Sequence, residues 1–296
     1  MQGKIILKGC SFSKPAMPTA LVVSEENKKT SFEEKTKQFQ NKVFSFYTKN
    51  KRELPWRNTT DPYKILLSEL MLQQTQVSRV VTYYTTWVDR WPTVQRLAEA
   101  SRSEVLGAWM GLGYNSRAVR LHQAAQKIVS EFQGHVIEAM KHYKELPGIG
   151  RYTSQAVQIF ATNADLVTVD TNIRRILIDE FHVSEDVSDK ALWGLAQACL
   201  PKGRSRDWHN ALMDFGALYL TSKKSGIAPK SRQSRFEGSD RQIRARILRQ
   251  LLQAHSSLLE LEKILGVEQK RLTQILEKMI HDQLIVKMNN TYRLNE

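Results

Sequence analysis

The sequence predicts an all-α domain from Phe32 to Leu220 and a smaller region, of helices and a hairpin, from Arg241 to Glu296. Apolar residues recur at three- and four-residue spacing throughout the first region, which is typical of amphipathic helices. A stretch rich in Gly, Ser, Lys and Arg, residues 225–240, then separates the two regions as a linker would. The length of 296 residues and the hydrophobic content of 41% suit two domains with real cores.

The helical segments follow one another between short breakers. They are expected at 66–88, 118–132, 153–162, 172–181 and 192–200, with breakers at 53–63, 111–116, 146–151 and 200–208. After the linker, three helical segments precede "LIVKMNNTYRL", a hairpin with Asn289 and Asn290 at its turn. Three helices and a hairpin predict a winged-helix-like domain. We divide the chain into a flexible tail 1–31, a main domain 32–222, a basic linker 223–240 and a domain 241–296.

Composition narrows the class of protein. No apolar run is long enough to span a bilayer, and residues 1–31 contain no signal-peptide core, so we expect a soluble intracellular protein. Two cysteines, Cys10 and Cys199, are too few for a thiolate metal cage or a disulfide framework. The formal net charge is +14, and residues 202–250 hold twelve Lys or Arg against four Asp or Glu. Phosphate binding and a merely solvated basic face both explain this clustering.

A carboxylate interrupts an apolar run. Residues Ile65 to Leu72 are aliphatic or Met except for Ser68 and Glu69, and a neutral polar cluster follows: Gln73, Gln74, Thr75 and Gln76. Glu69 could be the solvated edge of an ordinary helix. If its apolar neighbours surround it, desolvation favours the protonated form and makes it a loaded general acid.

Two further motifs concern turns before helices. Gly148 and Gly150 of "LPGIGRYT" permit a tight turn whose backbone amides, with the following helix N-terminus, could hold a phosphate. An ordinary interhelical loop is the alternative. Asp170 follows a strand-like run, 166–169, and opens the next helix, where a carboxylate is most often a cap. Amides at a helix start favour the ionised form of Asp170.

Six motifs in order resemble those of one family. They are "LPWR" at 54–57, "SELMLQQTQV" at 68–77, "WMGLGYNSRAVRLHQAA" at 109–125, "ELPGIGRYT" at 145–153, "VDTNIRRIL" at 169–177 and "ALMDFGAL" at 211–218. Together they resemble the helix-hairpin-helix base-excision glycosylase superfamily, and most closely its MutY-type adenine DNA glycosylases. The resemblance covers Phe32 to Leu220 and implies a two-lobed fold that binds double-stranded DNA as a monomer.

The resemblance also implies roles for individual residues. It makes Glu69 the general acid and base, Asp170 the carboxylate facing the sugar, and Tyr152 and Asn172 their catalytic neighbours. It assigns DNA or base contacts to Arg57, Gln73, Gln74, Thr75, Tyr114, Leu146, Gly148, Gly150, Arg151 and Thr153. The implied reaction is hydrolysis of the N-glycosidic bond of a flipped adenine opposite 8-oxoguanine or G.

The residue at position 152 bears on the type of reaction. Bifunctional relatives carry a Lys there that attacks the sugar, whereas Tyr152 cannot form a Schiff base, so we expect a monofunctional enzyme that uses water. Thymine-excising relatives share the Tyr but lack an equivalent of Glu69. A mismatch glycosylase for thymine or uracil and a catalytically silent DNA-binding module remain alternatives.

The chain departs from the family in three places. MutY-type enzymes usually carry four cysteines after "ALMDFGAL" as ligands of a four-iron cluster, and this chain has none there. We therefore expect no cofactor. We also expect no metal ion, except for a monovalent cation that carbonyl groups of the hairpin could bind. Basic residues could brace that loop along DNA instead: Lys223, Lys224, Lys230 and Arg232. The Nudix-like C-terminal domain of the family is missing, so recognition of 8-oxoguanine stays open, as does DNA contact by Lys270, Arg271 and Lys278. Asn115 stands where many relatives have a second aromatic residue.

Overall fold

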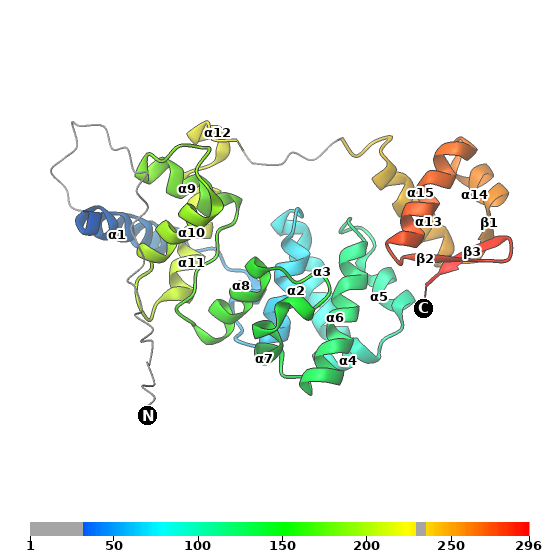
Figure 1. Cartoon of the computed structure of the whole chain (residues 1–296), viewed down its shortest axis with the longest axis horizontal. Coiled ribbons are helices and arrows are strands. Elements are labelled where there is room, and N and C mark those ends of the chain that lie inside the picture. The colour runs from blue at the N-terminus through cyan, green and yellow to red at the C-terminus, as the bar shows by residue number, and fades with distance from the viewer. Residues whose placement is uncertain (1–31, 229–234, 296) are drawn as a thin grey trace, which may run out of the picture.

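The computed structural model describes residues 32–228 and 235–295. They form two helical lobes side by side and a small third unit at the far end of the molecule (Figure 1). The predicted tail 1–31 and the linker residues Lys230 and Arg232 lie outside the described residues. Among the described residues, no helix is both long and apolar enough to cross a membrane.

The first lobe surrounds helix α2. It comprises η2 (Pro55–Arg57), α2 (Pro62–Leu72), α3 (Val77–Arg90), α4 (Val94–Glu99), α5 (Arg102–Trp109), α6 (Ser116–Phe132), α7 (Val136–Lys141), η3 (Tyr143–Glu145) and α8 (Arg151–Thr162). Asp61 caps α2 by accepting hydrogen bonds from the backbone of Tyr63 and Lys64, and Pro62 occupies the first helical position. Every residue from Ile65 to Met71 is buried, so α2 is enclosed on all sides.

The second lobe joins the start of the chain to its middle. It comprises α1 (Phe32–Asn50), α9 (Thr171–Phe181), α10 (Asp189–Ala198), α11 (Ser205–Asp214), the π-helical turn η4 (Phe215–Tyr219) and α12 (Ser222–Ser225). Its apolar core is separate from that of the first lobe and centres on Phe39, Trp208 and Phe215. The rings of Phe39 and Trp208 meet edge to face at 5.3 Å, which fixes α1 against α11. The two-lobed helical fold is confirmed.

The third unit has the predicted helices and hairpin. It contains α13 (Asp240–Leu251), β1 (Ser256–Ser257), α14 (Leu258–Leu265), α15 (Gln269–His281), β2 (Ile285–Met288) and β3 (Thr291–Leu294). The strands form an antiparallel sheet in the order β1-β3-β2, with Met288 opposite Thr291 beside the turn. This order of elements is a winged helix, and only the two-residue strand β1 was not expected. We call this unit the C-terminal module.

Two local expectations were wrong. Residues 66–88 do not form one helix, because α2 ends at Leu72 and α3 begins at Val77. Residues 166–169 do not form a strand; the backbone N–H of Thr168 instead donates to Nε2 of buried His209, 3.1 Å away. At the ends of the predicted linker 223–240, α12 extends through Ser225 and α13 begins at Asp240. Residues 166–169 satisfied the β-branched strand pattern, but within 32–228 and 235–295 the only strands are β1, β2 and β3, which pair with one another.

Candidate active site

A pocket of about 730 Å³ lies between the two lobes and gathers most of the predicted residues. The first lobe contributes Glu69 from α2, the polar residues that follow it, and Tyr152 from α8. The second lobe contributes Asp170 and Asn172 from the start of α9. Predicted residues that line it are Arg57, Glu69, Gln73, Gln74, Thr75, Tyr152, Asp170 and Asn172. Side chains more than 80 residues apart in sequence therefore face one cavity.

Glu69 has the surroundings that its sequence position predicted. Its side chain is buried with 7% relative exposure, within the apolar length of α2. Burial raises the pKa of Glu69 to about 7, a hydrogen bond from Tyr152 lowers it in part, and the charge of Asp170 raises it. Near neutral pH a substantial fraction of Glu69 is therefore protonated, as a general acid requires.

Asp170 caps α9 and accepts hydrogen bonds from two residues. Its Oδ1 accepts from the backbone N–H of Ile173 at 2.7 Å, and its Oδ2 accepts from Nδ2 of Asn172 at 3.2 Å. Burial nevertheless raises the pKa of Asp170 above its ordinary value, although these hydrogen bonds and the charge of Arg175 lower it in part. The expected effect of the cap amides is confirmed, because the hydrogen bond from the backbone of Ile173 lowers the pKa of Asp170, but desolvation outweighs it.

Arg175, which the sequence reasoning did not single out, organises the Asp170 side of the pocket. Its Nη2 donates to Oδ1 of Asn172 at 2.7 Å and to the carbonyl of Gly216 at 2.9 Å, and its Nε donates to Leu220 at 2.7 Å. A Cβ at Gly216 would lie 2.9 Å from Cβ of Asn172, so a glycine is required there. The π-helical turn η4 therefore packs against Asn172, the residue whose side-chain amide donates to Asp170.

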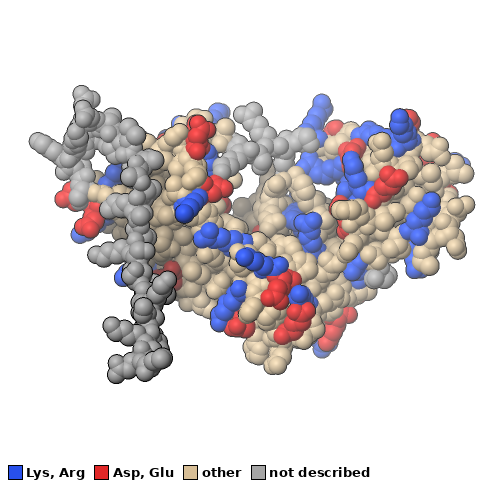
Figure 2. All heavy atoms as spheres, in the orientation of Figure 1, with Lys and Arg blue, Asp and Glu red and all other residues tan. Residues whose placement is uncertain are grey.

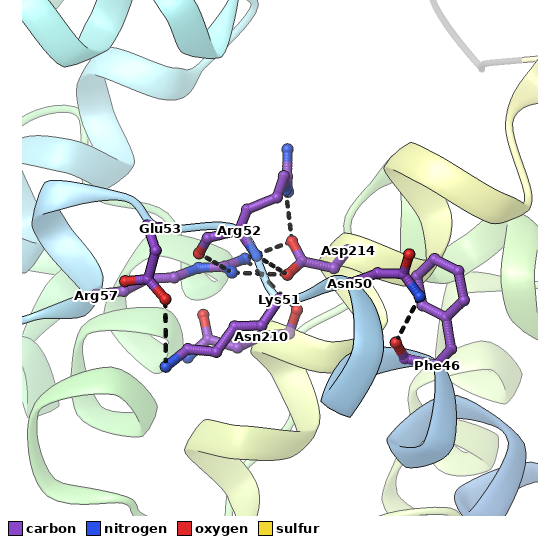
Figure 3. Close-up of polar contacts among 8 residues, drawn as sticks. All are labelled: Phe46, Asn50, Lys51, Arg52, Glu53, Arg57, Asn210 and Asp214. Carbon is purple, nitrogen blue, oxygen red and sulfur yellow. Dashed lines mark hydrogen bonds and ion pairs between the residues drawn. The ribbon is translucent and has the colours of Figure 1, made fainter.

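Arg57 is part of a buried ion-pair cluster (Figure 3). Its Nη1 and Nη2 each lie 2.8 Å from a carboxylate oxygen of Asp214, which is fully buried, and they also donate to the carbonyls of Arg52 and Asn210. Arg52 adds its backbone N–H and its Nε, 3.0 Å and 2.5 Å from Asp214. Arg57 reaches the pocket wall, but the donors of its two terminal nitrogens are used within the protein, which favours a structural role over base contact.

Burial acts to raise the pKa of Asp214, but hydrogen bonds and charge from Arg57 and Arg52 hold it below the ordinary value. Asp214 stays ionised and joins α11 to the segment that precedes α2. The sequence analysis did not single out Asp214, although a pattern marks it: an acidic residue stands between the apolar residues Met213 and Phe215, as Glu69 stands within its apolar run.

The hairpin before α8 contains both exposed and buried residues. Gly148 has φ +74°, and a Cβ there would lie 2.8 Å from Cβ of Arg120, so the turn requires glycine. Gly150 caps α8, whose first amide N–H groups have no acceptor within the helix. Leu146 and Thr153 are buried with 4% and 3% exposure, so their side chains support the hairpin rather than contact DNA directly. Exposed Arg151 lies 4.0 Å from the ring centroid of Trp193, which also lines the pocket.

The polar loop after α2 is held by Arg117, another residue that was not singled out. Buried Arg117 donates from Nη1 to the carbonyls of Leu70 at 2.6 Å and Met71 at 3.1 Å, and from Nη2 to Oγ1 of Thr75 at 3.0 Å. Burial lowers the pKa of Arg117 to about 10, which still leaves it charged at neutral pH. Tyr114 lies in the adjacent loop 111–115, outside the pocket lining, with φ +50°.

The chain does not fit a four-iron cluster. Such a cluster takes four cysteine thiolates, and the sequence contains only Cys10 and Cys199. Cys199 is buried in the second lobe, where burial raises the pKa of its thiol to about 12. Among the described residues, no group of three or more His, Cys, Asp or Glu side chains is arranged to hold a metal ion.

Basic side chains lie on both sides of the hollow between the lobes, with acidic ones interspersed (Figure 2). Lys223 and Lys224 are exposed on α12, and Nζ of Lys224 lies 3.9 Å from the ring centroid of Tyr219. Arg271 of the C-terminal module is instead paired with Asp240 at 2.8 Å and donates to the carbonyl of Gly238. DNA contact by Arg271 would require it to leave these partners, whereas Lys270 and Lys278 are exposed.

Comparison with known proteins agrees with this geometry. Residues 67–197 match the HhH-GPD superfamily of base excision DNA repair proteins. The chain is 39% identical to the adenine DNA glycosylase of Homo sapiens over 199 residues, 63% of this chain and 36% of the human protein. It is 38% identical to the adenine DNA glycosylase of Mycolicibacterium smegmatis over 227 residues, 70% of this chain and 78% of that protein.

A solved thermostable thymine-DNA glycosylase has the same architecture. It superimposes with a TM-score of 0.62 at 32% identity and covers 67% of this chain and 91% of its own. The matched residues 67–197 include Glu69, Tyr152 and Asp170 of the pocket. The chain therefore belongs to the HhH-GPD superfamily of base excision DNA repair proteins, as a MutY-type member.

Proposed function

We propose that this protein is a monofunctional DNA glycosylase that binds duplex DNA as a monomer and removes a mispaired adenine by hydrolysis. The observation that carries the proposal is the pair of carboxyl groups in one pocket, Glu69 with a pKa near 7 and Asp170 at a helix start. The similarity to proteins named adenine DNA glycosylase supports adenine as the leaving base.

The chemistry follows from the surroundings of each carboxyl group. Protonated Glu69 donates its proton to the purine as the N-glycosidic bond breaks, so the base leaves neutral. Asp170, ionised at a pH above its raised pKa, faces the positive charge that develops on the sugar. The carboxylate of Glu69 then accepts a proton from the water that adds to C1′, which restores the acid. Each step needs the base outside the stack, and the pocket is large enough to hold one.

Excision of thymine or uracil is the second candidate. The similarity to a thymine-DNA glycosylase and the Tyr at position 152 favour it. A pyrimidine leaves without protonation more readily than adenine, so such an enzyme would not depend on Glu69. The two functions therefore differ in what the Glu69→Gln variant does.

The test is single-turnover base release from duplexes that contain A opposite 8-oxoguanine, A opposite G, T opposite G and U opposite G. We expect the wild type to release adenine, and Glu69→Gln and Asp170→Asn each to lower the rate by about a hundredfold or more at preserved affinity. Glu99→Gln, a change at an exposed residue paired only with Arg96, serves as the control. Release of thymine or uracil alone would establish the second candidate, and near-wild-type adenine release by Glu69→Gln would overturn the assigned acid.

A further inference from the structure

The C-terminal module contacts the loop that carries Tyr114. Arg241 lies in the first turn of α13, and its Nη1 donates to the Tyr114 hydroxyl at 2.8 Å. Its guanidinium carbon also lies 5.3 Å from the centroid of the Tyr114 ring. This contact joins residues 127 positions apart in the chain.

Tyr114 lies between two guanidinium groups. The guanidinium carbon of Arg117 is 5.7 Å from the same ring centroid, and Arg117 is anchored to the end of α2. Arg117 also donates to Oγ1 of Thr75, a residue of the pocket wall. Tyr114 is therefore contacted by Arg117 of the first lobe and by Arg241 of the module.

Other contacts fix the position of α13 relative to the first lobe. Two side chains of the first lobe donate to Gln283 of the module. Nε2 of Gln123 donates to the side-chain oxygen of Gln283 at 2.8 Å, and Nη1 of Arg102 donates to its backbone carbonyl at 3.4 Å. The apolar side chains of the module belong to the same core cluster as those of the first lobe. The helix that carries Arg241 is therefore packed against the first lobe, which fixes the position of Arg241 relative to Tyr114.

We propose that Arg241 is a positioning residue through which the C-terminal module sets the orientation of Tyr114 for insertion into duplex DNA. The proposal rests on the proposed function, because a flipped base leaves a gap in the stack, and the family resemblance implies that Tyr114 fills or wedges the stack at that point. An aromatic side chain that enters a base stack must be ordered in one rotamer, and ordering it before binding removes that entropic cost from the complex. A hydrogen bond to the hydroxyl and a cation over the ring restrain both torsions of the side chain.

The test is a double-mutant cycle between Arg241→Ala and Tyr114→Phe, which removes only the hydroxyl. The measured quantity is the Kd for a duplex with 2′-fluoro-2′-deoxyadenosine, which resists cleavage, opposite 8-oxoguanine. We expect Arg241→Ala to weaken binding about tenfold, Tyr114→Phe about fivefold, and the double variant no more than about tenfold, because both changes break one contact. Arg241→Lys, which keeps a cationic donor, should recover part of the loss.

Arg246→Ala is the matched control, since that arginine lies on the same helix and donates to the carbonyls of Leu265 and Ile264 inside the module. Melting temperatures of Arg241→Ala and Arg246→Ala within a degree or two of each other would separate positioning from a loss of folding. Additive effects in the cycle, or unchanged affinity in Arg241→Ala, would overturn the proposal. A wild type that binds with this coupling but releases no adenine would overturn the proposed function and leave the role of the contact standing.

Discussion

Tyr152 donates a hydrogen bond to the carboxyl group of Glu69, across the junction between α8 and α2. The hydrogen bond stabilises the ionised form of Glu69 and so lowers its pKa, in opposition to burial. Burial and the neighbouring charge of Glu69 raise the pKa of the Tyr152 hydroxyl well above its ordinary value, so it remains a donor throughout the physiological range.

Removing this hydroxyl should therefore extend activity to higher pH. In Tyr152→Phe the pKa of Glu69 should rise above about 7, because only the stabiliser of the ionised form is lost. The measurement is the single-turnover rate of adenine release between pH 5.5 and 9. We expect the basic limb to lie near pH 7 in the wild type and to move upward in Tyr152→Phe; a downward shift would contradict the assignment. Tyr143→Phe, in η3 outside the pocket lining, is the control.

Burial of Glu69 should also make folding stability depend on pH. Its pKa is about 7 in the folded protein against 4.5 ordinarily, so the folded state binds the proton more tightly. The contribution of Glu69 to the free energy of unfolding is then greatest below about pH 4.5. It is lost as pH rises through about 7, by up to roughly 3 kcal/mol. Glu69→Gln lacks this loss, so its free energy of unfolding relative to wild type should increase between pH 5 and pH 8. Parallel urea titrations at the two pH values measure it; a constant difference would indicate an unperturbed carboxyl group.

Asp214→Asn should strongly destabilise the protein. The change leaves Arg57 and the adjoining part of Arg52 without their counter-charge, and breaking a buried ion pair typically costs about 3 kcal/mol or more. Asp207→Asn breaks only an exposed pair with Arg204 and should change stability by less than about 0.5 kcal/mol. Urea unfolding of both variants provides the comparison. Equal stability of the two would show that the cluster in Figure 3 contributes little.

Tyr152→Lys should introduce strand-nicking activity. A lysine at this buried position would have its pKa lowered by desolvation and could attack the sugar as a free amine. The measurement is borohydride trapping of a covalent adduct with a duplex that contains the substrate mispair. Tyr152→Arg, which is cationic but not nucleophilic, is the control. Absence of any adduct from a variant that still binds the duplex would show that the amine does not reach C1′.

We also expect the purified protein to be colourless and active without iron. Neither the segment after α11 nor the rest of the sequence supplies four cysteines. Metal analysis and the absorption spectrum of freshly prepared protein measure this directly. A stoichiometric iron content with a broad visible band would contradict the prediction.

The sequence predicted the parts of the fold that local chemistry determines. Periodicity indicated α2, α3, α6, α8, α9 and α10, although it joined α2 and α3 into one segment, and an Asn-Asn turn located the hairpin of the C-terminal module. The apolar run 65–72 left two interpretations of Glu69, a solvated helix edge and a buried acid, and the structure shows that Glu69 is buried. The six motifs, whose order the resemblance used, placed Asp170 and Tyr152 in the same pocket.

Other features depend on residues that meet only in the folded chain. Arg57 and Asp214 are 157 positions apart, and Arg241 and Tyr114 are 127 apart, so no local pattern marks either pair. The capping amides lower the pKa of Asp170 as the sequence predicted, because they are local in sequence, whereas the desolvation that outweighs them comes from the walls of a pocket that two lobes build together. The sequence identified Glu69 and Asp170 as the candidate catalytic carboxyl groups, and the tertiary structure decided how their pKa values shift, because electrostatic free energy depends on the whole dielectric surroundings of a group.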